Sequence, residues 1–248
     1  MTRLHLLGTG APASDPHRTT TMLSISDKFG SVLIDCGGDA LQRAMMVGIE
    51  VGDIKTMILT HEHPDHVGGW PLFLEKIWLH GQTPSFSVYG PAPALEQARK
   101  NFAAYDTSNW AGLPDVAWRA VPLDPKSHFL TIGPLRFSST PTTHAVPCVA
   151  IRVDNTATGG SMCYSADTTP SDDVAELATG CHILVHEASG DNPVHSSAED
   201  AARIARRAGC KRLILVHLPM GMTDDDLGDA RAIFPDVSLG EELGEYTF

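Results

Sequence analysis

The sequence predicts an α/β protein in which two β-sheets are sandwiched between two layers of helices, an αββα four-layer arrangement. Short apolar runs separated by turns fill the first part of the chain, and a second block of short strands follows later. The final part alternates strands with helices. Strand blocks of this kind pack as sheets covered by helices. Because no repeat of fixed period or low-complexity linker interrupts the chain, we expect one domain, residues 1–248.

The first half of the chain reads as strands and helices separated by glycine-rich turns. Expected strands cover 3–10, 19–26, 31–38, 54–60 and 86–90, with a hairpin turn at 28–30. Helical spacing of apolar residues occurs in 38–49, 70–81 and 91–106. Gly81 is placed to end the second of these helices.

The second half continues with a loop at 107–115 and a block of short strands. Those strands are expected near 116–123, 135–140, 148–153 and 161–167. Strands at 182–188, 210–217 and 236–239 then alternate with helices at 196–209 and 223–234.

Composition is that of an ordinary globular protein, with 42% hydrophobic and 19% charged residues. No apolar run is long enough for a membrane span, and the N-terminal apolar segment is too short for a secretory signal, so we expect a cytoplasmic protein. The cysteines are scattered, with no CxxC pair: Cys36, Cys148, Cys163, Cys181 and Cys210. They are therefore expected to be buried thiols rather than a disulfide framework or a cysteine zinc site.

The formal net charge of −12 disfavours nucleic acid as a partner, because such a field repels phosphates unless basic residues gather on one face. The basic clusters at 99–100, 206–207 and 211–212 are small. Solvated helix or strand ends explain these pairs at least as well as a phosphate-binding track.

The segment "ILTHEHPDHVGG", residues 58–69, places three histidines and two acids between His61 and His66, directly after an apolar strand. Imidazole and carboxylate groups suit zinc and related divalent ions. Histidines two positions apart and the adjacent Asp65–His66 pair could face two ions from one loop, which Pro64 would stiffen. This segment alone cannot complete such a site, so further ligands must come from elsewhere in the chain.

The motif formed by His61, His63, Asp65 and His66 and followed by Gly68–Gly69 resembles the signature of the metallo-β-lactamase-fold hydrolases, which have the αββα fold. That superfamily carries its remaining ligands at later strand ends, where this chain has His144, Asp167 and His217. The resemblance implies one ion held by His61, His63 and His144. It implies a second ion held by Asp65, His66 and His217. Asp167 would bridge the two, and Asp35 in "LIDCGG" would lie behind the histidines.

Two positions separate the branches of this superfamily. His63 stands where the diiron oxygen-reducing branch has glutamate, which favours a zinc-type hydrolase with manganese or iron as alternatives. Asp167 stands where true β-lactamases have cysteine. No C-terminal helical domain, as in glyoxalase II, is present in the sequence.

Three later stretches resemble ribonuclease Z and its phosphodiesterase relatives: "ILVHEAS" at 183–189, residues 195–209 and "KRLILVH" at 211–217. The resemblance implies that Glu187 and His195 work beside the metals, with His195 as proton donor or charge stabiliser. The plainer alternatives are a helix N-terminal histidine beside the Ser196–Ser197 cap and a paired strand-end acid.

One departure from ribonuclease Z concerns the long arm that grips tRNA, which bacterial forms carry between the third and fourth motifs. Here residues 145–166 read as a plain hairpin turning at 158–160. The segment 17–21 also lacks the asparagine expected after Arg18. The sequence thus resembles a ribonuclease Z-like phosphodiesterase branch that lacks the tRNA-binding arm.

The resulting expectation is a dinuclear metal-dependent phosphodiesterase that attacks a small or cyclic phosphodiester through a metal-bridging hydroxide, which Asp65 would orient. Hydrolysis of a lactone, carboxylic ester or sulfate ester on the same site is the main alternative. A ribonuclease Z-type tRNA 3′-processing endonuclease ranks lower, and a non-catalytic metal-binding protein ranks last. The expected partners are a small-molecule ester substrate and a second copy in a homodimer. Trp110 and Leu113 belong either to a lid or to a surface loop.

Overall fold

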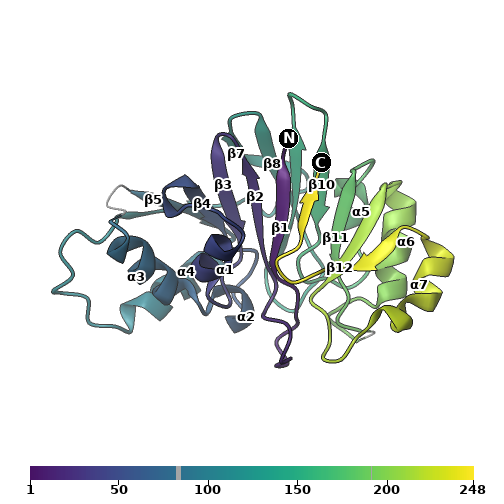
Figure 1. Ribbon diagram of the computed structural model, residues 1–248, viewed down its shortest axis with the longest axis horizontal. Coiled ribbons are helices and arrows are strands. Elements are labelled where there is room, and N and C mark those ends of the chain that lie inside the picture. Colours follow the sequence, from purple (N-terminus) through teal and green to yellow (C-terminus); the bar gives the residue numbers. More distant parts are fainter. Residues whose placement is uncertain (82–84, 191) are drawn as a thin grey trace.

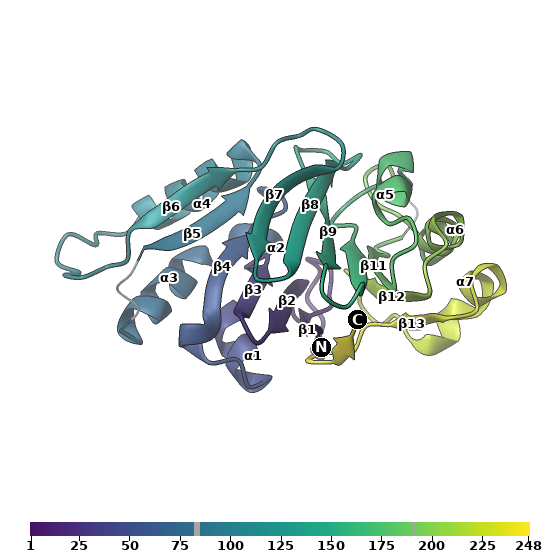
Figure 2. The same ribbon diagram turned by 90° about the horizontal axis from the view of Figure 1, so that it is seen from above.

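The computed structural model describes residues 1–81, 85–190 and 192–248, which form two seven-stranded sheets with helices on the outer faces (Figure 1). The first sheet has the order β14-β1-β2-β3-β4-β5-β6, and the second has the order β13-β12-β11-β10-β9-β8-β7. The predicted αββα sandwich is confirmed. Figure 2 views the sandwich from the end where both chain termini lie close together.

The first sheet combines an antiparallel and a parallel half. Its strands are β1 (Arg3–Gly8), β2 (Met22–Asp27), β3 (Gly30–Ile34), β4 (Ile54–Ile58), β5 (Phe86–Gly90), β6 (Val116–Ala120) and β14 (Glu245–Thr247). The predicted hairpin at 28–30 is confirmed, because β2 and β3 pair in antiparallel register. Strands β3 to β6 then run parallel to one another.

The second sheet has the same two-part construction. Its strands are β7 (Ser127–Ile132), β8 (Leu135–Pro141), β9 (Val149–Asn155), β10 (Ser161–Tyr164), β11 (Ile183–Glu187), β12 (Arg212–Val216) and β13 (Val237–Leu239). Strands β10 to β13 are parallel. Residues 145–166 are all described and contain only the antiparallel β9–β10 hairpin, so the tRNA-gripping arm is absent from this segment, as predicted.

Helices cover the outer face of each sheet. Those on the first sheet are α1 (Ala40–Met46), α2 (Pro64–Val67), α3 (Trp70–Leu79) and α4 (Ala92–Ala103), with the 3₁₀ turn η1 (Val51–Asp53). Those on the second are α5 (Asp172–Leu177), α6 (Ala198–Ala208) and α7 (Gly228–Ile233), with η2 (Asp224–Leu227). The sequence reading missed the short elements β14, α2 and α5 and also missed β7, which is as long as β1 and β2. No helix of the described chain is long and apolar enough to cross a membrane.

Apolar side chains fill three layers, one between the sheets and one under each set of helices. Strand β12 shows how one strand serves two of them: Ile214 and Val216 face the other sheet, whereas Leu213 and Leu215 face the helices. A parallel strand buried on both faces must be apolar throughout, which is why "LILV" shows no alternation with polar residues.

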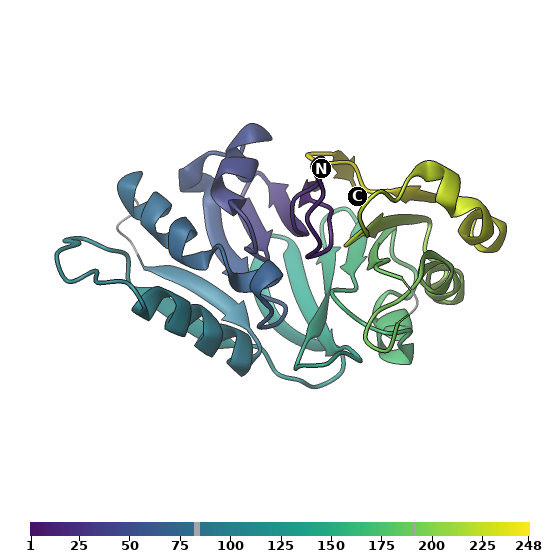
Figure 3. The same ribbon diagram turned by 90° about the horizontal axis from the view of Figure 1, so that it is seen from below.

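The carboxyl ends of β3, β4, β10, β11 and β12 meet at one edge of the sandwich, which Figure 3 views from below. The backbone turns sharply where some of these strands end, because Asp35, Ala166 and His217 all adopt left-handed φ angles of 65°, 50° and 53°. Non-glycine residues in this conformation store strain, and such residues cluster at functional sites. This edge is therefore where the sequence-predicted site residues are expected to lie.

The loop around Trp110 packs on helix α3 at the outer end of the first sheet (Figure 1). The Trp110 ring stacks on Trp78 with centroids 4.9 Å apart, and Leu113 packs against the core under the helices. These contacts favour the surface-loop interpretation over the lid.

The loop after β3 approaches helix α2 closely at Gly37, and a substitution there tests this contact. A Cβ atom at Gly37 would lie 1.7 Å from the Asp65 carbonyl oxygen, so one backbone must move. We expect Gly37→Ala to lower the free energy of unfolding by about 1–3 kcal/mol, the usual cost of forcing extra atoms into a packed site. Urea denaturation measures this.

Gly228→Ala is the matched control, because Gly228 has helical angles and a Cβ there meets no atom within 4 Å. It should leave stability unchanged or slightly raised. Equal unfolding free energies for both variants and the wild-type chain would contradict the close approach at Gly37.

Candidate metal centre

The loop between β4 and α3 supplies the first set of polar side chains. His61 follows the buried end of β4, and His63 is the N-cap of α2, with Pro64 in the first helical turn. Asp65 and His66 come from α2 itself. Because α2 is a single short turn, these side chains project towards one point at the sheet edge.

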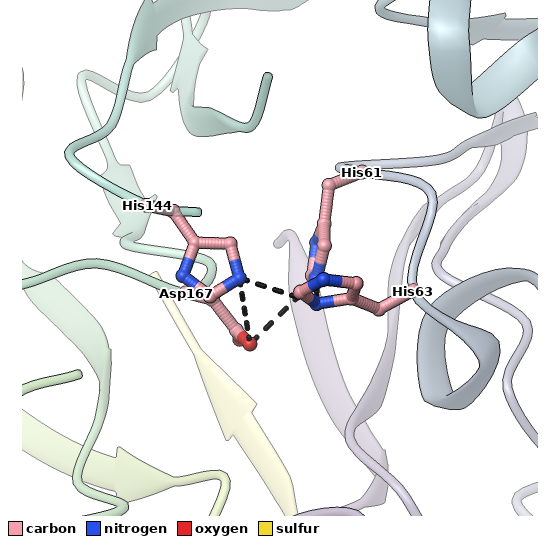
Figure 4. A group of neighbouring side chains, drawn as sticks. All are labelled: His61, His63, His144 and Asp167. Carbon is pink, nitrogen blue, oxygen red and sulfur yellow. Dashed lines mark hydrogen bonds and ion pairs between the residues drawn. The ribbon is translucent and has the colours of Figure 1, made fainter. Parts of the chain in front are cut away.

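Four side chains form the first cluster, in which His61, His63, His144 and Asp167 point towards one another (Figure 4). The His63 Nδ1 atom lies 3.0 Å from His61 Nε2 and 3.2 Å from His144 Nε2. His144 comes from the loop after β8 and Asp167 from the loop after β10. Both sheets therefore contribute to this cluster.

Asp65, His66 and His217 form the second cluster. The Asp65 Oδ2 atom lies 3.4 Å from His66 Nε2 and 3.2 Å from His217 Nε2. His217 follows β12, so this cluster also joins the two sheets.

Asp167 lies between the clusters. Its Oδ1 atom is 3.5 Å from His66 Nε2, and its Oδ2 atom is 3.6 Å from His217 Nε2 and 3.7 Å from His61 Nε2. The structure thus brings together all seven side chains that the sequence assigned as ligands, and it places Asp167 where a bridging carboxylate would lie.

The outward-facing nitrogens of the histidines are held by hydrogen bonds. His66 Nδ1 lies 2.8 Å from Asp35 Oδ2, and His144 Nδ1 lies 3.0 Å from the Val194 carbonyl oxygen. In a neutral ring, an acceptor at this position holds the proton on Nδ1, so that the Nε2 lone pair is directed at the cluster. Histidine ligands in metal sites are oriented in this way.

Asp35 supports both clusters at once and is completely buried. Besides His66, its carboxylate accepts hydrogen bonds from the Thr60 amide at 2.7 Å and from the Thr60 hydroxyl at 2.8 Å. Because that hydroxyl donates to Asp35, it accepts from His61 Nδ1 at 3.1 Å. The predicted position of Asp35 behind the histidines is therefore observed.

Two buried atoms suit a cation. Neither His66 Nε2 nor Asp167 Oδ1 has a hydrogen-bond partner among the described residues, although each is shielded from water. An unsatisfied buried polar atom is costly, and a divalent ion would satisfy both a nitrogen lone pair and a carboxylate oxygen. These two atoms without partners therefore indicate that the histidine and carboxylate groups of the clusters fit metal ions.

The pKa shifts of four side chains suit metal ligands, whereas the pKa of His66 is raised, because the charges of Asp167 and Asp35 outweigh its burial. Burial lowers the pKa of His61 and of His144, which keeps both rings neutral. Burial alone would raise the pKa of Asp65, but the neighbouring rings of His217 and His66 hold it well below its usual range. The pKa of Asp167 is likewise lowered, because the surrounding histidines outweigh its burial.

Glu187 and His195 lie beside the clusters as the sequence predicted. His195 Nδ1 is 2.8 Å from Glu187 Oε1 and 3.9 Å from Asp167 Oδ2. Glu187 is fully buried at the end of β11 and also accepts hydrogen bonds from the Thr168 and Ser196 amides. Burial lowers the pKa of His195, but the hydrogen bond and charge of Glu187 outweigh it and raise the pKa above its ordinary value.

Sequence reasoning missed two side chains that hold the centre. Thr60 connects Asp35 with His61, and Ser189 contacts His217. Both lie within quoted motifs, "ILTHEHPDHVGG" and "ILVHEAS", yet hydroxyl residues at strand ends are too common to be singled out without coordinates.

Clustered histidines and carboxylates at the edge of an αββα sandwich define a metal-dependent hydrolase. A family model described as a β-lactamase superfamily domain matches residues 31–218, and the chain belongs to the metallo-β-lactamase superfamily. Ribonuclease Z from Mycobacterium avium (strain 104) is 32% identical over 249 residues, an alignment covering 88% of this chain and 86% of that protein.

Solved structures share the whole fold. The metallo-β-lactamase fold protein YhfI from Bacillus subtilis has a TM-score of 0.83 at 23% identity and covers 99% of this chain and 98% of its own. A diphosphatase from the PhnP family has a TM-score of 0.78 at 21% identity, covering 100% of this chain and 98% of its own. These likenesses confirm the predicted fold, and the relative named ribonuclease Z confirms the predicted resemblance to that family.

Metal content tests the two clusters directly. Protein purified without chelator and supplied with zinc should hold about two ions per chain, as dinuclear hydrolases do. His144→Ala should lower the affinity for one ion and His217→Ala for the other, because each removes a ligand from a different cluster. Elemental analysis after gel filtration measures this, and a wild-type chain with no bound ion would refute the centre.

Proposed function

We propose that the chain is a dinuclear phosphodiesterase that hydrolyses a small or cyclic phosphodiester. His61, His63 and His144 would hold one ion, Asp65, His66 and His217 would hold the other, and Asp167 would be shared by both. The observation that supports this proposal is the His195–Glu187 pair, which lies beside the two clusters and to which we assign the proton donor. Zinc is the proposed metal, because imidazole and carboxylate donors without thiolate suit it.

Two divalent ions, when bound, would lower the pKa of water and offset the negative charge that develops on phosphorus. The chain's own groups then have defined tasks. Asp65, whose side chain is 12% exposed, has its Oδ2 beside His66 and His217 and can accept a hydrogen bond from the attacking water. The fully buried His61 and His66 rings are held rigidly by Thr60 and Asp35.

His195 supplies the proton to the leaving oxygen. Its side chain is 17% exposed, so the ring can meet a substrate while Nδ1 stays bound to Glu187. The raised pKa of His195 favours the protonated ring, whose Nε2–H can donate to an alkoxide as the P–O bond breaks. The buried Glu187 keeps the ring oriented for this transfer.

A small substrate is supported by what surrounds the centre. Residues 145–166 form a short hairpin with no tRNA-binding arm, and the net charge of −12 opposes a polyanion. Arg18, in the loop between β1 and β2, is a cation that could meet a phosphate, but it pairs with Asp15 and donates to the Met222 carbonyl oxygen.

A tRNA 3′-processing nuclease is the second candidate, because sequence relatives named ribonuclease Z match nearly the whole chain. Lactone, carboxylic ester and sulfate ester hydrolysis would use the same centre.

A screen of the metal-loaded protein separates these functions. The proposal predicts turnover of bis(p-nitrophenyl) phosphate and of cyclic nucleotides, with little cleavage of a tRNA precursor. Efficient tRNA cleavage would establish the nuclease instead. Turnover of a lactone or sulfate ester without any diester cleavage would refute the phosphodiesterase.

His195→Ala tests the proton donor. We expect kcat on a diester with an alkoxide leaving group to fall on the order of 10²–10⁴-fold, the usual contribution of a general acid. With p-nitrophenolate as the leaving group, the loss should be much smaller, because that group departs without protonation. Steady-state kinetics on the two substrates measure the difference.

His128→Ala is the matched control, since His128 is an exposed histidine of β7 and should change neither rate. Bound metal should remain at the wild-type amount in both variants. An unchanged kcat of His195→Ala on the alkoxide diester would remove His195 from the mechanism.

A further inference from the structure

Ser189 lies in the segment between β11 and α6, two residues after Glu187, and its hydroxyl points at His217. We infer that Ser189 is a positioning residue that fixes the His217 ring for the second ion, the one proposed for Asp65, His66 and His217. This inference rests on the proposed metal centre and assigns one hydroxyl to one of its two ion positions.

Hydrogen bonding at Ser189 determines which nitrogen of His217 carries the proton. The Ser189 hydroxyl donates to the His217 carbonyl oxygen at 2.9 Å. The Oγ atom of this hydroxyl also contacts His217 Nδ1. A hydroxyl has only one proton to donate, so Nδ1 must be the donor in the second contact. His217 Nε2 is then left with its lone pair directed at Asp65 and Asp167.

Ser189 is itself held in place. Its amide donates to Glu187 Oε2 at 3.0 Å, and Glu187 is fully buried. The other oxygen of Glu187, Oε1, contacts His195 Nδ1. The Glu187 carboxylate therefore orients both His195, the proposed proton donor, and Ser189. Loss of the Ser189 hydroxyl would leave His217 Nδ1 without a hydrogen-bond partner among the described residues.

The effect should be confined to one ion. His61, His66 and His144 have their own partners, which are Thr60, Asp35 and the Val194 carbonyl. None of these hydrogen bonds involves Ser189. Removing its hydroxyl therefore perturbs only the cluster that contains His217.

Zinc titration of Ser189→Ala, with a chromogenic chelator as competitor, tests the inference without measuring activity. The wild-type chain should bind about two ions, and the variant should bind one ion with wild-type affinity and the other about 10–100-fold more weakly. Ser189→Thr keeps a hydroxyl and should restore the second affinity. Ser139→Ala is the control, because the Ser139 hydroxyl is buried in β8 without a hydrogen-bond partner among the described residues.

Each outcome decides a separate point. A wild-type chain that fails to bind two ions refutes the metal centre itself. A wild-type chain with two ions and a Ser189→Ala variant with the same two affinities overturns only the role of Ser189. Should the alanine variant not fold, Ser189→Thr and Ser189→Val carry the test, since they differ chiefly in a hydroxyl and a methyl group. Equal zinc affinities in that pair would also overturn the inference.

Discussion

The buried carboxylate of Asp35 is the contact on which the candidate centre depends. A carboxylate removed from water is costly unless hydrogen bonds replace its hydration. Asp35 receives them from the Thr60 amide, the Thr60 hydroxyl and His66. The same bonds tie the end of β3 to the end of β4 and to α2, so the motif histidines are held before any ion arrives. The left-handed backbone at Asp35 aims the carboxylate at this junction.

The centre also depends on packing between the sheets. The β4–α2 loop and α2 on the first sheet carry His61, His63, Asp65 and His66, whereas His144, Asp167 and His217 follow strands of the second. The apolar layer between the sheets fixes the distance between these groups. Each ion position therefore exists only in the folded domain, and binding of ions should stabilise the native state by mass action.

The sequence predicted the layers and most strands because their apolar periodicity is strong. The motif at residues 61–66 indicated a metal site, whereas His144, Asp167 and His217 were expected from the resemblance to a superfamily that has ligands at later strand ends. The sequence reading missed β7, whose side chains are only half-buried or exposed at a sheet edge, so that burial leaves little pattern. Helix α5 was missed because it has only six residues. Ser189 and Thr60 could not be assigned for a different reason: a hydroxyl acquires its role from a neighbour such as His217, which only the fold brings close.

A dinuclear metal centre with histidine and aspartate ligands can activate water for the hydrolysis of many kinds of ester. The centre alone therefore does not select a substrate. Selection must come from groups that meet the leaving oxygen and from the surface around them. In the His195–Glu187 pair, a fully buried carboxylate orients the imidazole ring and raises its pKa. In the proposed reaction, this pair would serve a diester whose departing oxygen is a poor leaving group, such as a sugar hydroxyl. An acidic chain without an arm in residues 145–166 then favours a small diester over a folded RNA.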